Sequence, residues 1–359
     1  MIYERMMRPL LMAIDAEKAH NLAVWSITNP LAQPFLSLTN VLMNTRSNRL
    51  KSQMCGLPLE NPIGLAAGFD KNAEMFPYLH KFGFGFVEIG TVTAHAQKGN
   101  EKPRLFRLKE DNALINRMGF NNHGAEDIAK RVSSKSAKTI LGGNIGKSKV
   151  TPLEDAISDY EQSFKLLKGH VQYFVINVSS PNTPNLRQLQ EKEPLKQLLK
   201  HLMALNKNPS CPLLLKIAPD LNEAQLEDIV SVVEESGIHG VIATNTTISR
   251  NGLKSDPTQV KAIGPGGLSG KPVKERSTEV LRFLRKALPK SVDLIGVGGV
   301  FSGADAYEKI RAGACCVQIY TGFVYRGPAT VFKTLSELET LLKRDGFSQV
   351  SEAIGIDAT

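Results

Sequence analysis

The chain has 359 residues, a mass of 39.3 kDa and a formal net charge of +9 at pH 7. Its 42% hydrophobic and 22% charged residues are ordinary for a soluble globular enzyme, which excludes the disordered and fibrous classes. Lysine and arginine are scattered along the chain rather than clustered, so the positive charge indicates a generally basic surface and we expect no nucleic-acid partner.

Cysteine, histidine and hydropathy patterns exclude several kinds of site. The four cysteines have neither metal-type spacing nor the density of a disulfide framework, which favours a reducing compartment, and the adjacent Cys315 and Cys316 are expected to be packed. The seven histidines form no HExxH or HxH pattern, so we expect no metal site. No run of about 18 apolar residues and no signal peptide is visible, so neither a membrane span nor export is predicted.

Residues 1–45 are predicted to form an amphipathic helical extension in front of the main domain. Pro9 should start or kink a first helix, and Asp15 is placed to cap a second. Two apolar stripes with helical spacing run through these helices, at Met6, Met7, Leu10, Leu11 and Ile14 and at Ala19, Leu22, Ala23 and Ile27. Helices this short can lie on a bilayer but cannot cross it, so we expect the extension to contact a membrane surface.

Short apolar, β-rich runs then alternate with longer segments of helical period, which is the pattern of a parallel sheet built from βα units. Most of these runs are continuously apolar, as strands covered on both faces should be. Eight strands are predicted, at residues 62–66, 84–90, 140–145, 173–178, 213–217, 241–244, 294–297 and 317–320, with helices that include 223–235 and 331–342. We therefore predict an α/β fold, a (β/α)8 TIM barrel over residues 46–345, followed by a C-terminal tail at 346–359.

Two long segments interrupt the alternation after strand ends. Residues 92–138 carry short strand-like pieces at 104–108 and 113–115 and one helix, whereas residues 246–274 are rich in glycine, proline, serine and lysine. Long insertions in a compact barrel usually serve as lids or binding loops. We expect both segments to contribute to a site.

Polar residues gather at the predicted carboxyl ends of the strands, where barrel enzymes build their sites. Lys216 interrupts an otherwise apolar strand, and an unpaired buried ammonium is costly. Its expected anionic partner is either a structural aspartate or glutamate or a reduced flavin, which carries negative charge on its pyrimidine edge. The glycine-rich segments 296–299 and 320–322 follow the last two strands, where barrels commonly hold a phosphate.

Ser180 lies in a polar segment, 177–184, that two prolines stiffen. On the residues alone the segment is either a rigid polar loop without chemistry or part of an active site. No histidine lies nearby in sequence and no nucleophile motif surrounds Ser180, so a Ser-His-Asp arrangement has no support. If Ser180 is catalytic, we expect it to move a proton.

Ten ordered motifs between residues 64 and 322 resemble those of the class 2 dihydroorotate dehydrogenase family. They include GLAAGFDK at 64–71, NVSSPNT at 177–183 and KIAPD at 216–220, with the others at 88–93, 104–108, 116–122, 243–247, 266–270, 296–299 and 318–322. The resemblance implies a TIM barrel that oxidises (S)-dihydroorotate to orotate in de novo pyrimidine biosynthesis. It also implies that hydride passes to FMN and that the electrons continue to a membrane quinone.

The same resemblance implies which residues hold each ligand. One FMN per chain would be held by Ala67, Gly68, Thr91, Asn144, Asn177, Lys216, Thr244, Gly270, Gly299, Tyr320 and Thr321. Dihydroorotate would be bound by Lys71, Asn116, Arg117, Met118, Gly119, Phe120, Asn177, Asn182, Asn245 and Thr246. A quinone site would include His20, Arg107 and Tyr320. Lysine suits a carboxylate as a point charge, and asparagine suits a ring that bears amide donors and acceptors.

Ser180 occupies the position of the catalytic base in the family. The soluble class 1 enzymes carry cysteine there, so the serine and the N-terminal extension both indicate class 2. Thr183 and Phe120 match family positions around the outlet for the proton. The resemblance further implies peripheral attachment at the cytoplasmic face of a bacterial inner membrane, without an iron–sulfur partner subunit.

Two alternative functions are weighed against this interpretation. Another FMN barrel that acts on a pyrimidine, such as a dihydrouridine synthase on tRNA, would need a concentrated basic patch or an RNA-binding appendage, and neither is visible. A non-catalytic protein that binds a membrane surface would also account for the basic, amphipathic N-terminus. Purification distinguishes this second alternative, because such a protein would be colourless.

Overall fold

A closed barrel of parallel strands forms the centre of the molecule, in a computed structural model that describes residues 3–43, 47–207 and 211–358. Its strands are β3 (Ile63–Asp70), β4 (Phe86–Val92), β7 (Ile140–Ile145), β8 (Tyr173–Asn177), β9 (Leu213–Ile217), β10 (Gly240–Ala243), β12 (Asp293–Val297) and β13 (Cys316–Ile319). Pairing of Val317 with Ile63 joins β13 to β3 and closes the ring. The predicted TIM barrel and its eight strands are confirmed, with boundaries that shift by a few residues.

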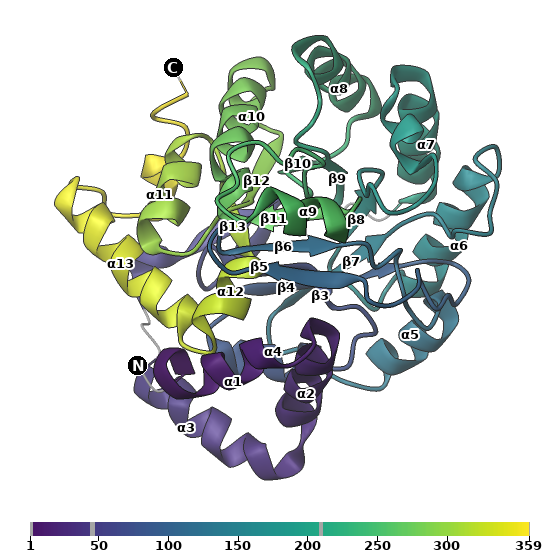
Figure 1. Cartoon of the computed structure of the whole chain (residues 1–359). Coiled ribbons are helices and arrows are strands. Elements are labelled where there is room, and N and C mark those ends of the chain that lie inside the picture. The colour runs from purple at the N-terminus through teal and green to yellow at the C-terminus, as the bar shows by residue number, and fades with distance from the viewer. Residues whose placement is uncertain (1–2, 44–46, 208–210, 359) are drawn as a thin grey trace.

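Helices ring the barrel on its outer side (Figure 1). They include α4 (Phe76–Leu79), α5 (Ala125–Ser133), α6 (Ala156–Leu167), α7 (Lys192–Leu205), α8 (Glu223–Ser236), α10 (Lys274–Ala287), α11 (Gly303–Arg311), α12 (Thr321–Arg326) and α13 (Thr330–Arg344). A capping box between Asn222 and Gln225 starts α8, and Gly237, with φ of +69°, ends it. The predicted apolar stripe of α13 is buried against the barrel. A helix with one buried face repeats its apolar residues with a helical period, so this period alternates along the chain with the continuous apolar runs of the strands.

A small antiparallel sheet crosses the carboxyl ends of the barrel strands (Figure 1). It consists of β5 (Leu105–Leu108), β6 (Ala113–Asn116) and β11 (Gly267–Gly270), and α9 (Pro257–Ile263) precedes β11. The first two strands match the predicted strand-like pieces, whereas β11 and α9 lie in residues 246–274, for which no strand or helix was predicted. Gly270 has φ of +102°, and a Cβ there would lie 2.3 Å from the Asn112 carbonyl oxygen, so the end of β11 requires glycine.

A short hairpin lies across the opposite, amino-terminal end of the barrel. It is formed by β1 (Ser52–Met54) and β2 (Leu57–Leu59), which the sequence analysis did not predict. Ser52 Oγ donates to the Cys315 carbonyl oxygen at 2.8 Å, just before β13 begins. Cys315 and Cys316 are themselves buried free thiols, as expected. Met54 packs with Phe86 and Tyr173 inside the barrel, so the interior at this end is filled with side chains.

Within residues 3–43, the described part of the N-terminal extension, there are three α-helices, one more than predicted: α1 (Arg8–Ala13), α2 (Ala16–Thr28) and α3 (Gln33–Met43). Pro9 lies in the first turn of α1, and the Asp15 carboxylate caps α2 by accepting from the backbone N–H groups of Glu17 and Lys18. Both predictions are confirmed. The helices lie together beside the barrel in Figure 1, and none of the helices in the described ranges combines the length and hydropathy needed to span a membrane.

The C-terminal segment after α13 packs back onto the barrel. Val350 and Ala353 are fully buried, and Asp357 forms an ion pair with Arg311 of α11 at 2.6 Å. The segment therefore belongs to the same packed body as the helices around it.

Candidate functional site

A cavity with an empty volume of about 1050 Å³ opens at the carboxyl ends of the barrel strands. The small sheet and the loops after the strands supply the rest of its wall. Most residues proposed from the sequence line it: Ala67, Gly68, Lys71, Thr91, Asn116, Met118, Gly119, Phe120, Asn177, Ser180, Asn182, Lys216, Thr244, Asn245, Thr246, Gly270, Gly299, Tyr320 and Thr321. The structure thus brings together residues that lie on, or directly after, seven of the eight barrel strands.

Five proposed residues do not line this cavity. Asn144 is buried behind Thr91, whose hydroxyl donates to the Asn144 side-chain oxygen at 2.6 Å. The Arg117 guanidinium turns away and donates to the carbonyl oxygens of Ile263 and Pro103. Thr183 is 5% exposed, and its hydroxyl has no hydrogen-bond partner among the described residues. His20 lies on α2 of the N-terminal extension, and Arg107 of β5 contacts that extension at Ile14.

Amide side chains form a connected polar wall in the cavity. Asn177 Nδ2 donates to Thr91 Oγ1 at 2.9 Å, and Asn245 Nδ2 donates to Asn177 Oδ1 at 3.3 Å. On the side of the small sheet, Asn182 Nδ2 donates to Asn116 Oδ1 at 3.0 Å. These bonds fix the orientation of the amides, so the wall presents donors and acceptors in defined places.

Lys216 is the cation of the cavity floor. It is 5% exposed, and burial lowers the pKa of its ammonium, while the charge of Glu88 in β4 acts in the opposite direction. Glu88 is fully buried and accepts from Asn144 Nδ2 at 3.2 Å and from the Gln318 side-chain amide, and burial raises its pKa. Among the described residues no carboxylate lies within ion-pairing distance of Lys216. Glu88 thus acts on Lys216 only through its charge, from beyond ion-pairing distance, and the cavity leaves room for an anion beside the ammonium.

The loops after β12 and β13 form a close-packed end of the cavity. Gly299 has φ of +70°, and a Cβ there would lie 2.3 Å from the Lys274 Cβ. Thr321 begins α12, and its hydroxyl shares a 2.8 Å hydrogen bond with that of Ser269. Backbone without side chains, next to hydroxyl groups and the start of a helix, is the environment that phosphate groups prefer.

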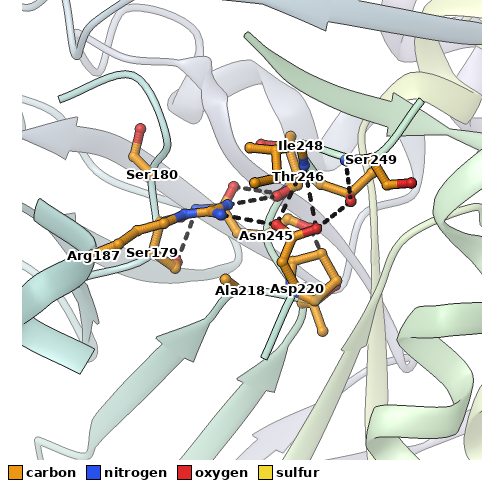
Figure 2. A network of polar contacts seen from close by, with 12 residues as sticks. Ser179, Ser180, Arg187, Ala218, Asp220, Asn245, Thr246, Ile248 and Ser249 are labelled. Carbon is orange, nitrogen blue, oxygen red and sulfur yellow. Dashed lines mark hydrogen bonds and ion pairs between the residues drawn. The ribbon is translucent and has the colours of Figure 1, made fainter. Parts of the chain in front are cut away.

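Ser180 lies in a loop that is tied to the neighbouring loops by Arg187 (Figure 2). The Arg187 Nε donates to the Ser179 carbonyl oxygen at 3.0 Å, and its Nη1 forms a 2.8 Å ion pair with Asp220, which follows β9. The third contact runs from Arg187 Nη2 to the Thr246 carbonyl oxygen at 3.2 Å, after β10. Ser180 itself is 5% exposed at the cavity wall. Because Arg187 holds the carbonyl oxygen of the preceding residue, Ser179, the position of Ser180 depends on this network.

Aromatic rings connect the cavity to the N-terminal extension. Tyr320 lines the cavity and packs edge-on against Phe69 at 5.8 Å, and Phe69 packs edge-on against His20 of α2 at 5.1 Å. Burial lowers the pKa of His20 to about 3, so its ring is neutral at physiological pH. Arg107 donates to the Ile14 carbonyl oxygen at 2.7 Å, between α1 and α2. Of the proposed quinone residues, His20 thus lies on the extension, Arg107 contacts the extension and Tyr320 lines the cavity.

Several residues of the site were not proposed from the sequence. Ser269 and Gln318 line the cavity, and Glu88 supports it from inside the barrel. Glu88 and Gln318 each place a polar side chain within an apolar strand, which is the signal that identified Lys216. Ser269 lies on β11 and reaches the cavity only through pairing of β11 with β6, which no local pattern indicates.

Known proteins resemble this chain over almost its whole length. The family model described as dihydroorotate dehydrogenase matches residues 49–342. A relative named dihydroorotate dehydrogenase (quinone) from Christiangramia forsetii is 52% identical, with 92% of this chain and 96% of the relative aligned. A relative of the same name from Gloeobacter violaceus is 47% identical over 98% of both chains.

Solved structures agree with these relatives. The crystal structure of the Eimeria tenella DHODH in complex with ferulenol superimposes with a TM-score of 0.86 at 37% identity, covering 95% of each chain. The similarity therefore extends over nearly the whole fold of both chains. The chain belongs to the dihydroorotate dehydrogenase family, in its quinone-linked class.

Proposed function

We propose that this protein oxidises (S)-dihydroorotate to orotate, with one FMN per chain as hydride acceptor and a membrane quinone as the final electron acceptor. The observation that carries this proposal is one cavity in which two lysines, Lys71 and Lys216, lie with Ser180 and a wall of asparagines. This set matches an anionic amide substrate together with a cofactor that becomes negatively charged on reduction.

The side chains around Lys216 fit a flavin. Lys216, Asn177 and Thr91 would hold its polar ring edge, with Asn144 supporting Thr91 from behind. Gly270, Gly299, Tyr320 and Thr321 would hold the phosphate, where glycine allows the closest approach of the backbone. FMN bound here would supply the redox chemistry, as acceptor of the substrate hydride and donor of electrons to quinone.

Lys71 and the amide wall fit dihydroorotate. The Lys71 ammonium would pair with the substrate carboxylate, and Asn116, Asn182 and Asn245 would bind the ring amides. Arg117 would contact the substrate only through its backbone, because its guanidinium donates hydrogen bonds to the carbonyl oxygens of Ile263 and Pro103. The asparagines are already oriented by one another, which lowers the entropy cost of binding.

Ser180 would act as the base that removes a proton from the ring carbon beside the carbonyl. Its hydroxyl oxygen accepts a 3.2 Å hydrogen bond from the Asn182 backbone N–H, and its burial excludes bulk water. A serine hydroxyl is a weak base near neutral pH, so the proton needs an outlet. Our candidates for that outlet are the Thr183 hydroxyl, which has no hydrogen-bond partner among the described residues, and Phe120, which lines the cavity.

Quinone would reach the flavin from the side of the N-terminal extension, past His20, Arg107 and Tyr320. Large apolar side chains are exposed just before α1, on α1, on α2 and on the segment that follows α2, at Met6, Met7, Leu10, Leu22, Trp25, Leu31, Phe35 and Leu38. An exposed apolar surface of this kind supports peripheral attachment to a membrane, which we place at the cytoplasmic face of a bacterial inner membrane. In this scheme the electrons pass directly to quinone, without an iron–sulfur partner subunit.

Anaerobic mixing with dihydroorotate tests the proposal. Purified protein should be yellow, dihydroorotate should bleach its flavin absorbance stoichiometrically, and a quinone should restore the absorbance. A colourless preparation would contradict the cofactor assignment, and a flavin that dihydroorotate does not bleach would contradict the substrate assignment.

A further inference from the structure

A second cavity lies between helix α2 of the extension and the wall of the main cavity. Its empty volume is about 770 Å³, and its lining includes Glu17 and His20 of α2 together with Phe69, Asp70 and Asn121 of the barrel. Lys71 and Met118 line both cavities. The residue proposed to bind the substrate carboxylate is therefore a shared wall between the substrate cavity and the extension.

Glu17, which lines this second cavity, forms a buried ion pair with Arg104. Glu17 accepts from Arg104 in two places, from Nη2 to Oε1 at 2.7 Å and from Nε to Oε2 at 3.1 Å. Glu17 is 9% exposed and Arg104 is 6% exposed, and Lys102 adds a more exposed contact to Glu17 at 3.4 Å. Bidentate pairing of a guanidinium with a carboxylate is geometrically specific, so the pair fixes α2 against the barrel.

Arg104 also fixes the peptide segments that carry the substrate-binding asparagines. Its Nη1 donates to the carbonyl oxygens of Lys98 at 2.6 Å and Asn100 at 2.8 Å. The Asn100 side chain donates in turn to the carbonyl oxygens of Arg117 at 3.0 Å and Asn182 at 3.4 Å. One guanidinium thus connects the extension to the segments on both sides of the substrate cavity.

We propose that the Glu17–Arg104 pair is a positioning device for the substrate site, which balances the charge around Lys71 so that the lysine binds the carboxylate of dihydroorotate. This inference rests on the proposed role of Lys71. It assigns to α2, a helix of the quinone-side extension, a direct contribution to substrate affinity.

Four charged or titratable groups surround the Lys71 ammonium. Burial lowers its pKa to about 8, the negative charges of Glu17 and Asp70 raise it, and the positive charge of Arg104 lowers it. Asp70, whose own pKa burial raises to about 6, is ionised above neutral pH, and His20, with its pKa of about 3, is neutral there. Between pH 7 and 9.5 none of these four groups is expected to titrate, whereas Lys71 is.

The two partners of the ion pair act on Lys71 with opposite sign, which gives a sharp test. Orotate binding to the oxidised holoenzyme is measured through the change in the flavin spectrum from pH 6.5 to 9.5. Affinity should fall above the pKa of Lys71. In Glu17→Gln this fall should move to lower pH by about one unit, and in Arg104→Gln to higher pH, since a single nearby charge shifts a pKa by about this amount. Above pH 8.5, Glu17→Gln should bind orotate up to about tenfold more weakly than wild type.

Two control variants separate this effect from general damage. Asp15→Asn removes the same charge from the exposed start of α2 and keeps a good helix cap, so its pH profile should match wild type. Arg104→Lys retains the positive charge and should restore the wild-type profile more closely than Arg104→Gln. Profiles that do not move, or that move in the same direction in Glu17→Gln and Arg104→Gln, would overturn the inference. Absence of any saturable orotate signal in wild type would instead overturn the proposed substrate site.

Discussion

Ser180 carries the most direct prediction at the scale of single residues. Ser180→Ala should slow anaerobic flavin reduction by dihydroorotate by about 10²- to 10⁴-fold, because a positioned base is removed. The variant should keep its FMN content and its rate of reoxidation by quinone, since the alanine leaves the surrounding hydrogen bonds of Arg187 unchanged. Stopped-flow measurement of flavin bleaching checks this, and a rate within a few fold of wild type would make Ser180 only a loop residue.

Single residues also mark how far the sequence predicts the site. Lys216 could be singled out because its charge contradicts the apolar strand around it, and the structure places it in the cavity. Glu88 breaks its strand in the same way, but its role depends on Asn144 and Gln318, which come from other strands. A pattern along one strand indicates that a polar group needs partners, and only the folded barrel determines which partners are near.

At the scale of elements, Arg187 joins three loops that follow neighbouring strands (Figure 2). Arg187→Gln should slow flavin reduction by dihydroorotate by roughly 10- to 100-fold, because small displacements of a catalytic loop are costly. FMN content should stay unchanged. Asp220→Asn should have a similar effect, and the double variant should be little slower than either single one, because both remove the same ion pair. Losses that multiply in the double variant would show that the two residues act independently.

The extension carries a second prediction at this scale. Replacing Leu10, Leu22 and Leu31 together by serine removes exposed apolar surface without altering the buried face of α2. Co-sedimentation with lipid vesicles should fall, and so should turnover with a long-tailed quinone in vesicles, since membrane binding scales with apolar area. Turnover with a short, water-soluble quinone should match wild type. Equal turnover of both proteins with the long-tailed quinone would contradict membrane contact through these side chains.

Elements differ in how well the sequence predicts them, for physical reasons. The barrel strands are buried on both faces, so each leaves an apolar run that is visible by itself. By contrast, β1, β2 and β11 have only three or four residues each, too few to show a period. The third helix of the extension begins at Gln33, only three residues after Pro30, so the proline obscures the start of the helical pattern.

At the scale of the whole molecule, a buried lysine should make stability depend on pH. Lys309 of α11 is fully buried and donates to Ser277 Oγ at 2.6 Å and Thr278 Oγ1 at 3.0 Å in α10. Burial lowers its pKa from the ordinary 10.5 to about 7. Between pH 7 and 10.5 the unfolded chain binds a proton at Lys309 that the folded chain does not. The free energy of unfolding therefore rises with pH through this window, and this gain is lost as the pH falls towards 7.

Lys309→Met should remove this dependence. From pH 7 to 9 the free energy of unfolding of wild type should rise relative to the variant, by at most about 1.4 kcal/mol per pH unit. Denaturant unfolding of both proteins at several pH values measures the difference. Lys290→Met, at an exposed site, serves as the control and should follow wild type throughout. Parallel curves for wild type and Lys309→Met would contradict the prediction.

The small sheet over the cavity mouth joins strands that are far apart in the chain. Strand β6 ends at Asn116, and its partner β11 begins at Gly267. A nascent chain therefore cannot close the mouth until most of the barrel has been synthesised, and Gly299 and Thr321, at the close-packed end of the cavity, come later still. The cofactor can therefore bind only late in the synthesis of each chain. A cell short of flavin would accumulate nearly complete barrels whose small sheet covers an empty cavity.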